Sequence, residues 1–392
     1  MNSFYREYLD AAVERRGTHC IKWDHLQQIY GRSDLESAWV ADMDFRTVPA
    51  VRDALVERAE HAIYGYTDDE EANRLAEVKW LQRRHQLKVE PDWILYSPGV
   101  VDSIFFCVRA LTEEGDAVLI QTPVYGPFYE AIHIFNRRLV ENPLVETEEG
   151  WRIDFDDLDQ KLADPAVKLM VLCNPHNPVG RIWTMEELTR MVNLANRHGV
   201  VIVSDEIHAD FALDGRRVPR ILTVPGAERS VMLASATKSF NLAGLRQSSC
   251  IVPDLELRKR IRLEIQRAHA VYPNLFGAIA QMTAYTYGDE WMDAVVEYIQ
   301  ENRDWFVAEL RRRIPKLKAR PQEGTYLLWV DFKDLGMEHE EIAKMLVEKA
   351  RVALVSGLEY GKGGRGFFRV NLATPRVHLE ELLNRLERAI NE

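Results

Sequence analysis

Between residues 93 and 255 the chain alternates short apolar runs with longer stretches in which apolar residues recur at helical spacing. The short runs read WILYS, AVLIQ, KLMVLC, VVIVSD, SVMLAS and SSCIVP. Because these runs are largely apolar on both faces, they predict strands buried in a mainly parallel sheet. The alternation is typical of an α/β fold in which helices cover both faces of the sheet. Ligands then bind at the carboxyl ends of the strands.

The stretches between the runs predict amphipathic helices, among them residues 101–112 and 184–198. In the second stretch, Thr184 and Glu187 have the spacing of a capping box, and Gly199 follows the last turn. This stretch therefore carries a start signal and a stop signal as well as the helical period.

After Asn274 the pattern changes. A long helical region with a break near Gly288 runs to about Arg313, and the runs TYLLWVDF, ALVSG and FFRVNLA follow between further helical stretches. This order predicts a small α/β domain. The first forty or so residues are too short to fold alone, so we expect them to pack against it. The predicted division is a large domain over 46–285 and a small domain formed by 1–45 and 286–392.

Composition narrows the class of protein. Of 392 residues, 46% are hydrophobic and 28% charged, which is typical of a globular chain. No apolar run approaches the ~18 residues that span a bilayer, and the start lacks the basic-then-apolar layout of a secretory signal. We therefore expect a cytoplasmic protein that does not enter a membrane. The net charge of -11 disfavours a nucleic-acid surface.

The four cysteines have no short paired spacing, which argues against a disulfide framework and against a zinc site. Cys107 and Cys173 lie in apolar runs, and we predict that both are buried structural thiols. No metal site is expected.

The segment SATKSFNLAGLR, residues 235–246, carries the strongest chemical signal. Lys238 follows a predicted strand, and a desolvated lysine there can form an imine with an aldehyde cofactor. Ser235 and Arg246 are residue types that suit phosphate oxygens. The alternative is a loop lysine beside a turn.

In VVIVSDEIHADF, Asp205 ends an apolar strand, where a charge is costly unless a partner compensates it. A pyridinium nitrogen is one such partner. His208 could face the ring oxygen of the same cofactor. Two alternatives stay open, a helix cap by Asp205 and a metal site formed by Asp205, Glu206 and His208. The metal site is disfavoured because no second His or Cys cluster stands at ligand spacing.

Three further turns follow predicted strands. In CNPHNPVG, Asn177 could donate its amide to a phenolate oxygen; alternatively the segment is only a rigid turn. In SPGVVDS, the backbone N–H groups of Val100 and Val101 could bind an anion at a helix N-terminus. In TPVYGPF, Tyr125 could lie flat on an aromatic ring, or simply pack.

Acidic and basic residues also stand near both ends of the chain. Arg369 lies inside the apolar run FFRVNLA and needs an anion, either a substrate α-carboxylate or a buried salt-bridge partner. Asp42 and Asp44 could cap a helix that begins near Val48, or anchor the N-terminal arm.

Together these segments resemble the fold-type-I PLP-dependent enzymes of the aminotransferase class I/II group, over nearly the whole chain and in the family's order. The resemblance implies a PLP-dependent transferase-like fold with pyridoxal 5′-phosphate as cofactor. It implies the following roles: Lys238 as Schiff-base lysine, Asp205 as partner of the pyridine nitrogen, Asn177 and His208 as partners of the ring oxygen, Tyr125 as stacking aromatic, Ser235, Arg246 and the amides of Val100 and Val101 as phosphate ligands, and Arg369 as clamp on the α-carboxylate. Tyr66 of the YGYT motif is expected to reach the phosphate in the partner subunit of a homodimer with shared active sites.

Finer motifs resemble the cystathionine β-lyase or C–S β-lyase branch of that group. They are WVADMDF, the histidine of SDEIH where many aminotransferases carry tyrosine, and SGLEYGKGGRGFFRVNLATPR. The branch implies α,β-elimination of L-cystathionine or a related cysteine S-conjugate to a thiol, pyruvate and ammonia. Arg246 is the more general aminotransferase feature. Transamination of an amino-acid substrate is the alternative, because it needs the same lysine and shares every step up to the carbanion. No second arginine supported by a motif would hold a dicarboxylate substrate.

Overall fold

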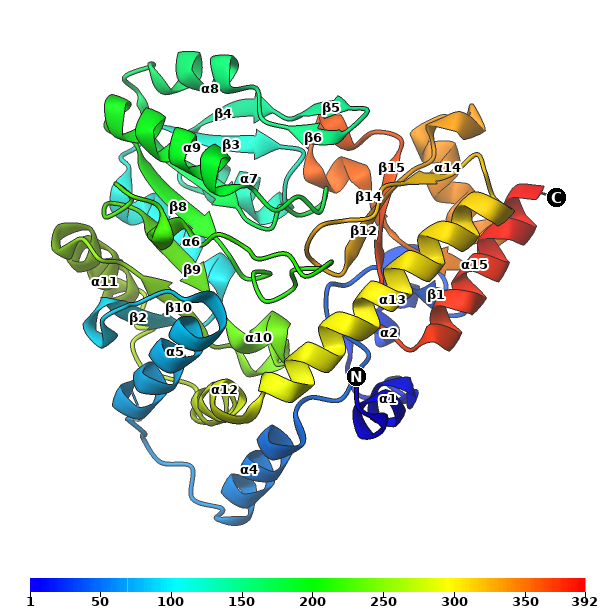
Figure 1. Cartoon of the computed structure of the whole chain (residues 1–392), viewed down its shortest axis with the longest axis horizontal. Helices are drawn as coiled ribbons and strands as arrows, with labels where there is room; N and C mark the ends of the chain where they lie inside the picture. Colours follow the sequence, from blue (N-terminus) through cyan, green and yellow to red (C-terminus); the bar gives the residue numbers. More distant parts are fainter. Residues whose placement is uncertain (69, 392) are drawn as a thin grey trace.

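The computed structural model describes residues 1–68 and 70–391. Its larger part is built on a seven-stranded sheet of order β2-β10-β9-β8-β7-β3-β4 (Figure 1). The strands are β2 (Ile94–Ser97), β3 (Ala117–Thr122), β4 (Arg138–Pro143), β7 (Val167–Cys173), β8 (Val201–Asp205), β9 (Val231–Ala234) and β10 (Ser248–Ile251). The run from β9 to β4 is parallel, whereas β10 pairs antiparallel with both β2 and β9. The predicted mainly parallel sheet is confirmed.

Helices cover both faces of this sheet. On one face lie α8 (Phe155–Leu162) and α9 (Met185–His198), which pack on alternate strand residues such as Leu119 and Met170. The other face is covered by α6 (Val100–Leu111), α7 (Gly126–Ile134) and α11 (Leu255–Arg267). The inner strands therefore bury both of their faces, which is why their sequences are apolar without alternation, whereas the edge strand β4 is only partly buried.

Local signals along these elements agree with the structure. The Thr184 hydroxyl accepts from the backbone N–H of Glu187, whose carboxylate accepts from the N–H of Thr184, and Gly199 ends α9 in the left-handed region. The predicted capping box is thus confirmed. Cys107 and Cys173 are buried, as predicted.

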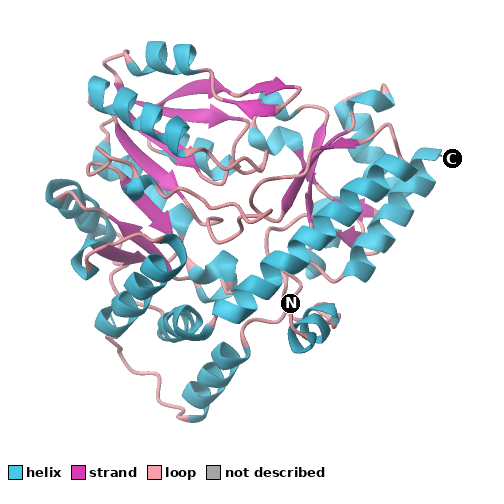
Figure 2. Ribbon diagram, viewed as in Figure 1, coloured by secondary structure: helices cyan, strands magenta, loops and turns pink. Residues whose placement is uncertain are grey.

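A second sheet, of order β11-β12-β15-β14, forms the smaller part of the molecule (Figure 2). Its strands are β11 (Lys318–Ala319), β12 (Leu327–Asp331), β14 (Val355–Ser356) and β15 (Phe367–Asn371). They pack with α13 (Asp289–Arg313), α14 (His339–Met345) and α15 (Arg376–Asn391). The predicted helix break is confirmed, because Gly288 separates α12 (Leu275–Tyr287) from α13.

The remaining elements lie around these two sheets. The hairpin of β5 (Val145–Thr147) and β6 (Gly150–Arg152) extends the larger part, and α10 (Ala236–Ser239) follows β9. A single-turn 3-10 helix, η6 (Gly357–Tyr360), precedes β15. The other α-helices and strands of the described chain are α1 (Ser3–Asp10), α2 (Ile21–Asp24), α3 (Leu26–Tyr30), α4 (Pro49–Glu60), α5 (Glu70–His85), β1 (Glu36–Ser37) and β13 (Val352–Ala353). No helix in residues 1–68 and 70–391 is long and apolar enough to cross a membrane.

The N-terminal segment joins the smaller part of the molecule. β1 pairs in parallel with β13, and Ala38 belongs to the same hydrophobic cluster as β12 and β15. The expected packing of the N-terminal residues is therefore observed. The domain boundaries after residues 45 and 285 stay predictions.

Asp44 anchors this segment by a buried ionic cluster. Its carboxylate accepts from Lys22 Nζ at 2.6 Å, from Arg15 Nη1 at 2.7 Å and from Trp23 Nε1 at 3.0 Å. Burial alone would raise the pKa of Asp44, but Lys22 and Arg15 outweigh it and lower the pKa to about 2. α4 begins after Val48 without any side-chain cap. The anchoring role of the arm is confirmed, and the helix-cap alternative is wrong.

We expect Asp44→Ala to lower the free energy of unfolding by about 3 kcal/mol, because it leaves the fully buried Lys22 ammonium without its carboxylate. The measurement is the urea midpoint at pH 7. Asp53→Ala is the matched control, since it removes only the exposed partner of Arg52 and should cost less than ~1 kcal/mol. Equal losses in the two variants would contradict the anchoring role of Asp44.

Candidate active site

A cavity of about 620 Å³ lies where loops of the two sheets meet. It is lined by Lys238, Tyr125 and Arg369. Tyr125 and Arg369 are more than 240 positions apart in the sequence. Its walls are formed by residues 39–41 of the N-terminal segment, the start of α7 and residues 358–361. Three predicted site residues are therefore brought together at the edge of the parallel sheet where its strands end.

Lys238 lies in α10, the single helical turn that follows β9. The Ser235 hydroxyl accepts from the N–H of Thr237 and so fixes the start of this turn. The Lys238 side chain is half-buried, and its amine donates to the carbonyl oxygen of Ala41. Desolvation lowers the pKa of the amine to about 8, with a smaller opposing effect of Asp42. About a tenth of this amine is thus uncharged at pH 7 and about half at pH 8, far more than for an ordinary lysine, as a nucleophile or base requires.

Asp205 ends β8 as a buried carboxyl group. Its Oδ1 accepts from the backbone N–H of Ile207 at 3.1 Å, and it forms no ion pair within residues 1–68 and 70–391. Burial raises its pKa to about 7. No helix begins at Asp205, so the helix-cap alternative is wrong. The Glu206 carboxylate pairs with Arg220 and accepts from the N–H of Ile221.

Arg369 points into the cavity from β15. Its Nη1 donates to Asn177 Oδ1 at 3.3 Å and its Nη2 to the carbonyl of Trp39 at 2.8 Å. The guanidinium lies 5.4 Å from the ring centroid of Tyr360. Among the described residues it forms no ion pair, and its buried Nε has no hydrogen-bond partner. The structural salt-bridge alternative is therefore wrong, and the guanidinium is available to an anion.

His208 and Asn177 flank the same site. Burial, with Lys238 and Arg369 adding to it, lowers the pKa of His208 well below its usual value, so the imidazole is neutral. Its buried Nδ1 has no partner in the part of the chain that the structure describes. Because Asn177 Oδ1 accepts from Arg369, the amide NH₂ of Asn177 remains free to donate. Both side chains can therefore serve a polar ligand.

The predicted phosphate ligands gather at the start of α6. Arg246 Nη2 pairs with Asp102 Oδ2 at 3.0 Å, in the first turn of the helix that Val100 and Val101 begin. The backbone of Arg246 is in the left-handed region, with φ of 48°. Backbone N–H groups and a guanidinium thus lie close together, which suits an anion.

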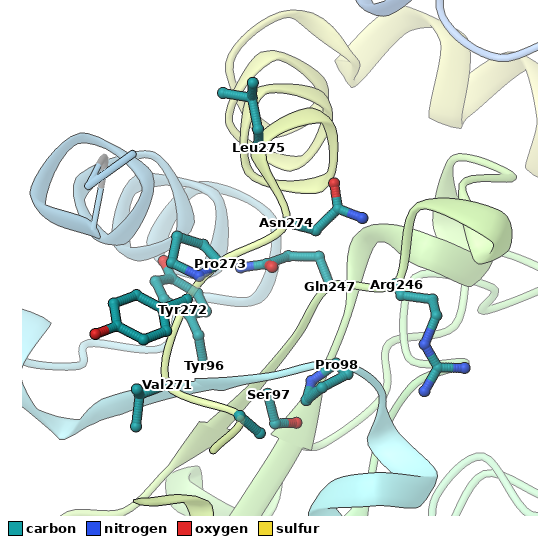
Figure 3. A pocket seen from close by; sticks show the side chains of 11 residues that line it. Tyr96, Ser97, Pro98, Arg246, Gln247, Val271, Tyr272, Pro273, Asn274 and Leu275 are labelled. Atoms are coloured by element: carbon teal, nitrogen blue, oxygen red, sulfur yellow. The ribbon is translucent and has the colours of Figure 1, made fainter. Parts of the chain in front are cut away.

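Ser235 joins this group through the backbone. Its hydroxyl donates to the carbonyl of Gln247 at 2.7 Å, one residue after Arg246. Figure 3 shows Arg246, Gln247 and Ser97 around a second hollow, of about 360 Å³, which residues 270–275 close on the other side. The roles of these residues toward a phosphate stay predictions.

Tyr66 is not part of the cavity in its own chain. Its side chain is fully exposed, and its ring centroid lies 6.2 Å from that of Tyr272. This position is compatible with the expectation that Tyr66 serves a neighbouring subunit, which stays a prediction.

Sequence reasoning missed the role of the backbone at residues 39–45. The carbonyl of Ala41 accepts from Lys238 and also from the Tyr326 hydroxyl at 2.9 Å, while Asn371 Nδ2 donates to the carbonyl of Val40 at 2.7 Å. The motif WVADMDF marked this segment, but only its carboxylates drew attention. A carbonyl oxygen is common to every residue, so no side-chain pattern could have revealed it.

Comparison with known proteins agrees with this geometry. Residues 40–386 match the family model "Aminotransferase class I and II". The chain belongs to this family. Cystathionine beta-lyase PatB of Bacillus subtilis (strain 168) is 40% identical over 97% of this chain and 99% of its own length. Protein MalY of Escherichia coli (strain K12) is 33% identical over 94% and 95%.

The fold has a close counterpart among solved structures. Cystalysin from Treponema denticola, whose crystal structure contains pyridoxal 5′-phosphate, matches with a TM-score of 0.94 and 31% identity over 97% of this chain and 98% of that chain. The resemblance to this family and the expected PLP-dependent transferase-like α/β fold are confirmed.

We expect Asp205→Asn to raise the Tm of the cofactor-free protein, and to do so more at pH 8 than at pH 4.5. The pKa of Asp205 rises on folding from 3.8 to about 7, so the folded state binds more protons between these values and stability falls as the pH rises through them. Asparagine removes that cost. Thermal unfolding at both pH values tests this, with exposed Asp156→Asn as control; the same gain at both pH values would contradict it.

Proposed function

We propose that this chain is a PLP-dependent C–S β-lyase that cleaves L-cystathionine or a related cysteine S-conjugate to a thiol, pyruvate and ammonia. The observation that carries the proposal is one cavity lined by the desolvated Lys238 amine and the unpaired Arg369 guanidinium. The first is suited to remove a proton, and the second to hold a carboxylate. The name of PatB supports a lyase over an aminotransferase.

The residues around the cavity fit pyridoxal 5′-phosphate. Asp205 is a buried carboxyl group without an ionic partner in the described chain, as a pyridinium nitrogen requires. The unpartnered Nδ1 of His208 and the free amide of Asn177 suit its ring oxygen, and Tyr125 would lie on the ring. When bound, this cofactor supplies an electron sink for the electrons released at Cα.

The residues that would hold the phosphate group of the cofactor are proposed on the same grounds. The N–H groups of Val100 and Val101, the hydroxyl of Ser235 and the guanidinium of Arg246 would hold it. Arg246 would then exchange part of its contact with Asp102 for the phosphate. These four residues lie in one place because α6, α10 and the turn after α10 all start at the same edge of the sheet.

Two side chains act on the substrate. Arg369 binds the α-carboxylate and so orients the amino acid against the Lys238 amine. Lys238, uncharged above a pH of about 8, removes the α-proton. The electron pair from the Cα–H bond forms the Cα–Cβ double bond, and the Cβ–S bond breaks to release the thiolate. The three-carbon fragment takes up water and yields pyruvate and ammonia. The Ala41 carbonyl accepts a hydrogen bond from the Lys238 amine in the structure, and it can also accept from the amine once it is protonated.

Transamination shares the same lysine and is the alternative. A dicarboxylate substrate would need a second guanidinium in the cavity, yet Arg369 is the only arginine among the described lining residues. The lining therefore argues against a dicarboxylate aminotransferase, and the distal carboxylate of L-cystathionine would likewise lie in this cavity without an arginine partner.

We further propose a homodimer with shared active sites, in which Tyr66 reaches the phosphate of the partner subunit. Ile63, Tyr64 and Tyr66 are all exposed, and Tyr272 beside them is exposed as well. An apolar and aromatic patch of this kind is typical of an interface. The division into domains over 46–285, and over 1–45 with 286–392, belongs to the same proposal.

The lyase proposal is tested by mixing purified yellow enzyme with L-cystathionine, without any keto acid, and measuring pyruvate and free thiol. We expect continuing release of both in equal amounts. Lys238→Ala should lower turnover by roughly 1000-fold, because the α-proton loses its base, whereas exposed Lys168→Ala should not. No pyruvate, but amino-group transfer once a 2-oxo acid is added, would make the chain an aminotransferase.

The dimer proposal makes a separate prediction. Tyr66→Phe should weaken cofactor binding about 5-fold through loss of one hydrogen bond, without changing the dimer mass. Cofactor titration by absorbance and sedimentation measure the two quantities. Tyr287→Phe, at another exposed tyrosine, is the control. A monomer, or a variant that binds the cofactor like the native protein, would refute the role of Tyr66.

A further inference from the structure

The outer wall of the active-site cavity carries two carboxylates, Glu130 on α7 and Glu359 on η6. The two elements are joined by the carbonyl of Tyr360, which accepts from the N–H of Val124 and from the hydroxyl of Tyr129, each at 3.0 Å. Each glutamate is the direct neighbour of a residue in this junction. Both therefore stand on backbone that is fixed relative to the cavity.

Neither carboxylate is neutralised by the protein. Glu130 and Glu359 form no ion pair or hydrogen bond within residues 1–68 and 70–391, whereas many other surface glutamates pair with an arginine. Both still act on the site. Burial raises the pKa of Glu359 and Arg369 opposes this rise, and Glu130 adds to the rise that burial causes in the pKa of Tyr125. The cavity is thus within the electrostatic field of both.

The charges that line the cavity are unevenly divided. The basic side chains among its described lining residues are Lys238 and Arg369, and the mechanism uses both at the α-carbon end of the substrate. The buried Nε of Arg369, which has no partner in the described chain, marks where the α-carboxylate is held. An amino acid held by Arg369 therefore shares the cavity with two carboxylates that form no ion pair in the described chain, and with no basic side chain among the described lining residues besides Lys238 and Arg369.

We propose that Glu359 and Glu130 make this site selective for cysteine S-conjugates whose leaving thiol carries an ammonium group. The inference rests on the proposed lyase function and names the preferred substrate class within it. L-Cystathionine meets the requirement, because its distal end bears an ammonium beside its carboxylate. Simple aminoalkyl conjugates meet it better, since they bring no second carboxylate toward the acidic wall.

Elimination kinetics give the first test. S-(2-Aminoethyl)-L-cysteine, S-propyl-L-cysteine and S-carboxymethyl-L-cysteine carry a cationic, a neutral and an anionic end on chains of similar length. We expect kcat/KM for pyruvate release to fall in that order, with the first ~5- to 10-fold above the second, as a partly desolvated ion pair gives. Glu359→Gln combined with Glu130→Gln should reduce this ratio to about twofold or less.

Equilibrium binding gives a second test that needs no elimination. L-Lysine, L-norleucine and L-2-aminoadipate cannot lose a thiol, and they present the same three kinds of end. We expect their Kd values for the holoenzyme, measured by calorimetry, to rise in that order. The double glutamine variant should bind lysine and norleucine with nearly equal Kd. Glu186→Gln, an exposed change on α9 outside the cavity, should keep the native order.

The two tests separate the two proposals. Equal Kd values for lysine and norleucine in the native enzyme, or an order that the double variant preserves, overturn the selectivity of the acidic wall. Absence of pyruvate from all three conjugates, together with the expected order of Kd values, refutes the lyase function and supports the wall.

Discussion

The hydrogen bond from the Lys238 amine to the Ala41 carbonyl is the contact around which the cavity is arranged. It joins the turn after a central strand to a backbone segment that lies nearly 200 positions earlier. An amine in this place loses hydration, so its pKa falls to about 8. The same desolvation that makes protonation costly makes the free amine a useful base. The carbonyl compensates part of the lost hydration without adding a charge, which a carboxylate in the same place would do.

Several buried polar groups of the site have no partner in the protein alone, and the bound ligands would supply the missing partners. Asp205 and Arg369 are buried without ionic partners in the described chain, and His208 keeps an unpartnered ring nitrogen. Each of these costs folding free energy in the protein alone. A cationic ring nitrogen, a phenolate and a carboxylate would compensate them one by one. Each unsatisfied group therefore indicates which kind of ligand atom would pair with it. The protein loses folding free energy at these groups and gains binding free energy when the ligands are present.

The sequence predicted the parts of the fold whose residues are buried on both faces. Six apolar runs became strands of the central sheet, and the capping box of α9 was visible in Thr184 and Glu187. β4 was missed, because an edge strand with the residues RLVENP is only partly buried and shows no apolar run. The same difference between buried and exposed residues decided which site residues could be predicted. Lys238, Asp205 and Arg369 stood out as charges in apolar surroundings. Glu130 and Glu359 did not, because the sequence does not distinguish an exposed, unpaired glutamate that borders a cavity from any other surface glutamate.

The segment 39–45 also fixes the distance between Lys238 and Arg369, which are positioned by different sheets. Arg369 belongs to the smaller sheet and Lys238 follows a strand of the larger one, yet both donate to carbonyls of this segment. The two acceptors are those of Trp39 and Ala41, which are two positions apart, so the chain holds them within about 7 Å of each other. The base and the carboxylate anchor are thereby held at the scale of one amino acid, whose α-proton and carboxylate are attached to neighbouring carbons. The ionic cluster at Asp44 and the hydrogen bonds of Asn371 fix this segment on both sides. The geometry of the reacting groups therefore depends on an N-terminal segment whose backbone carbonyls accept hydrogen bonds from both of them.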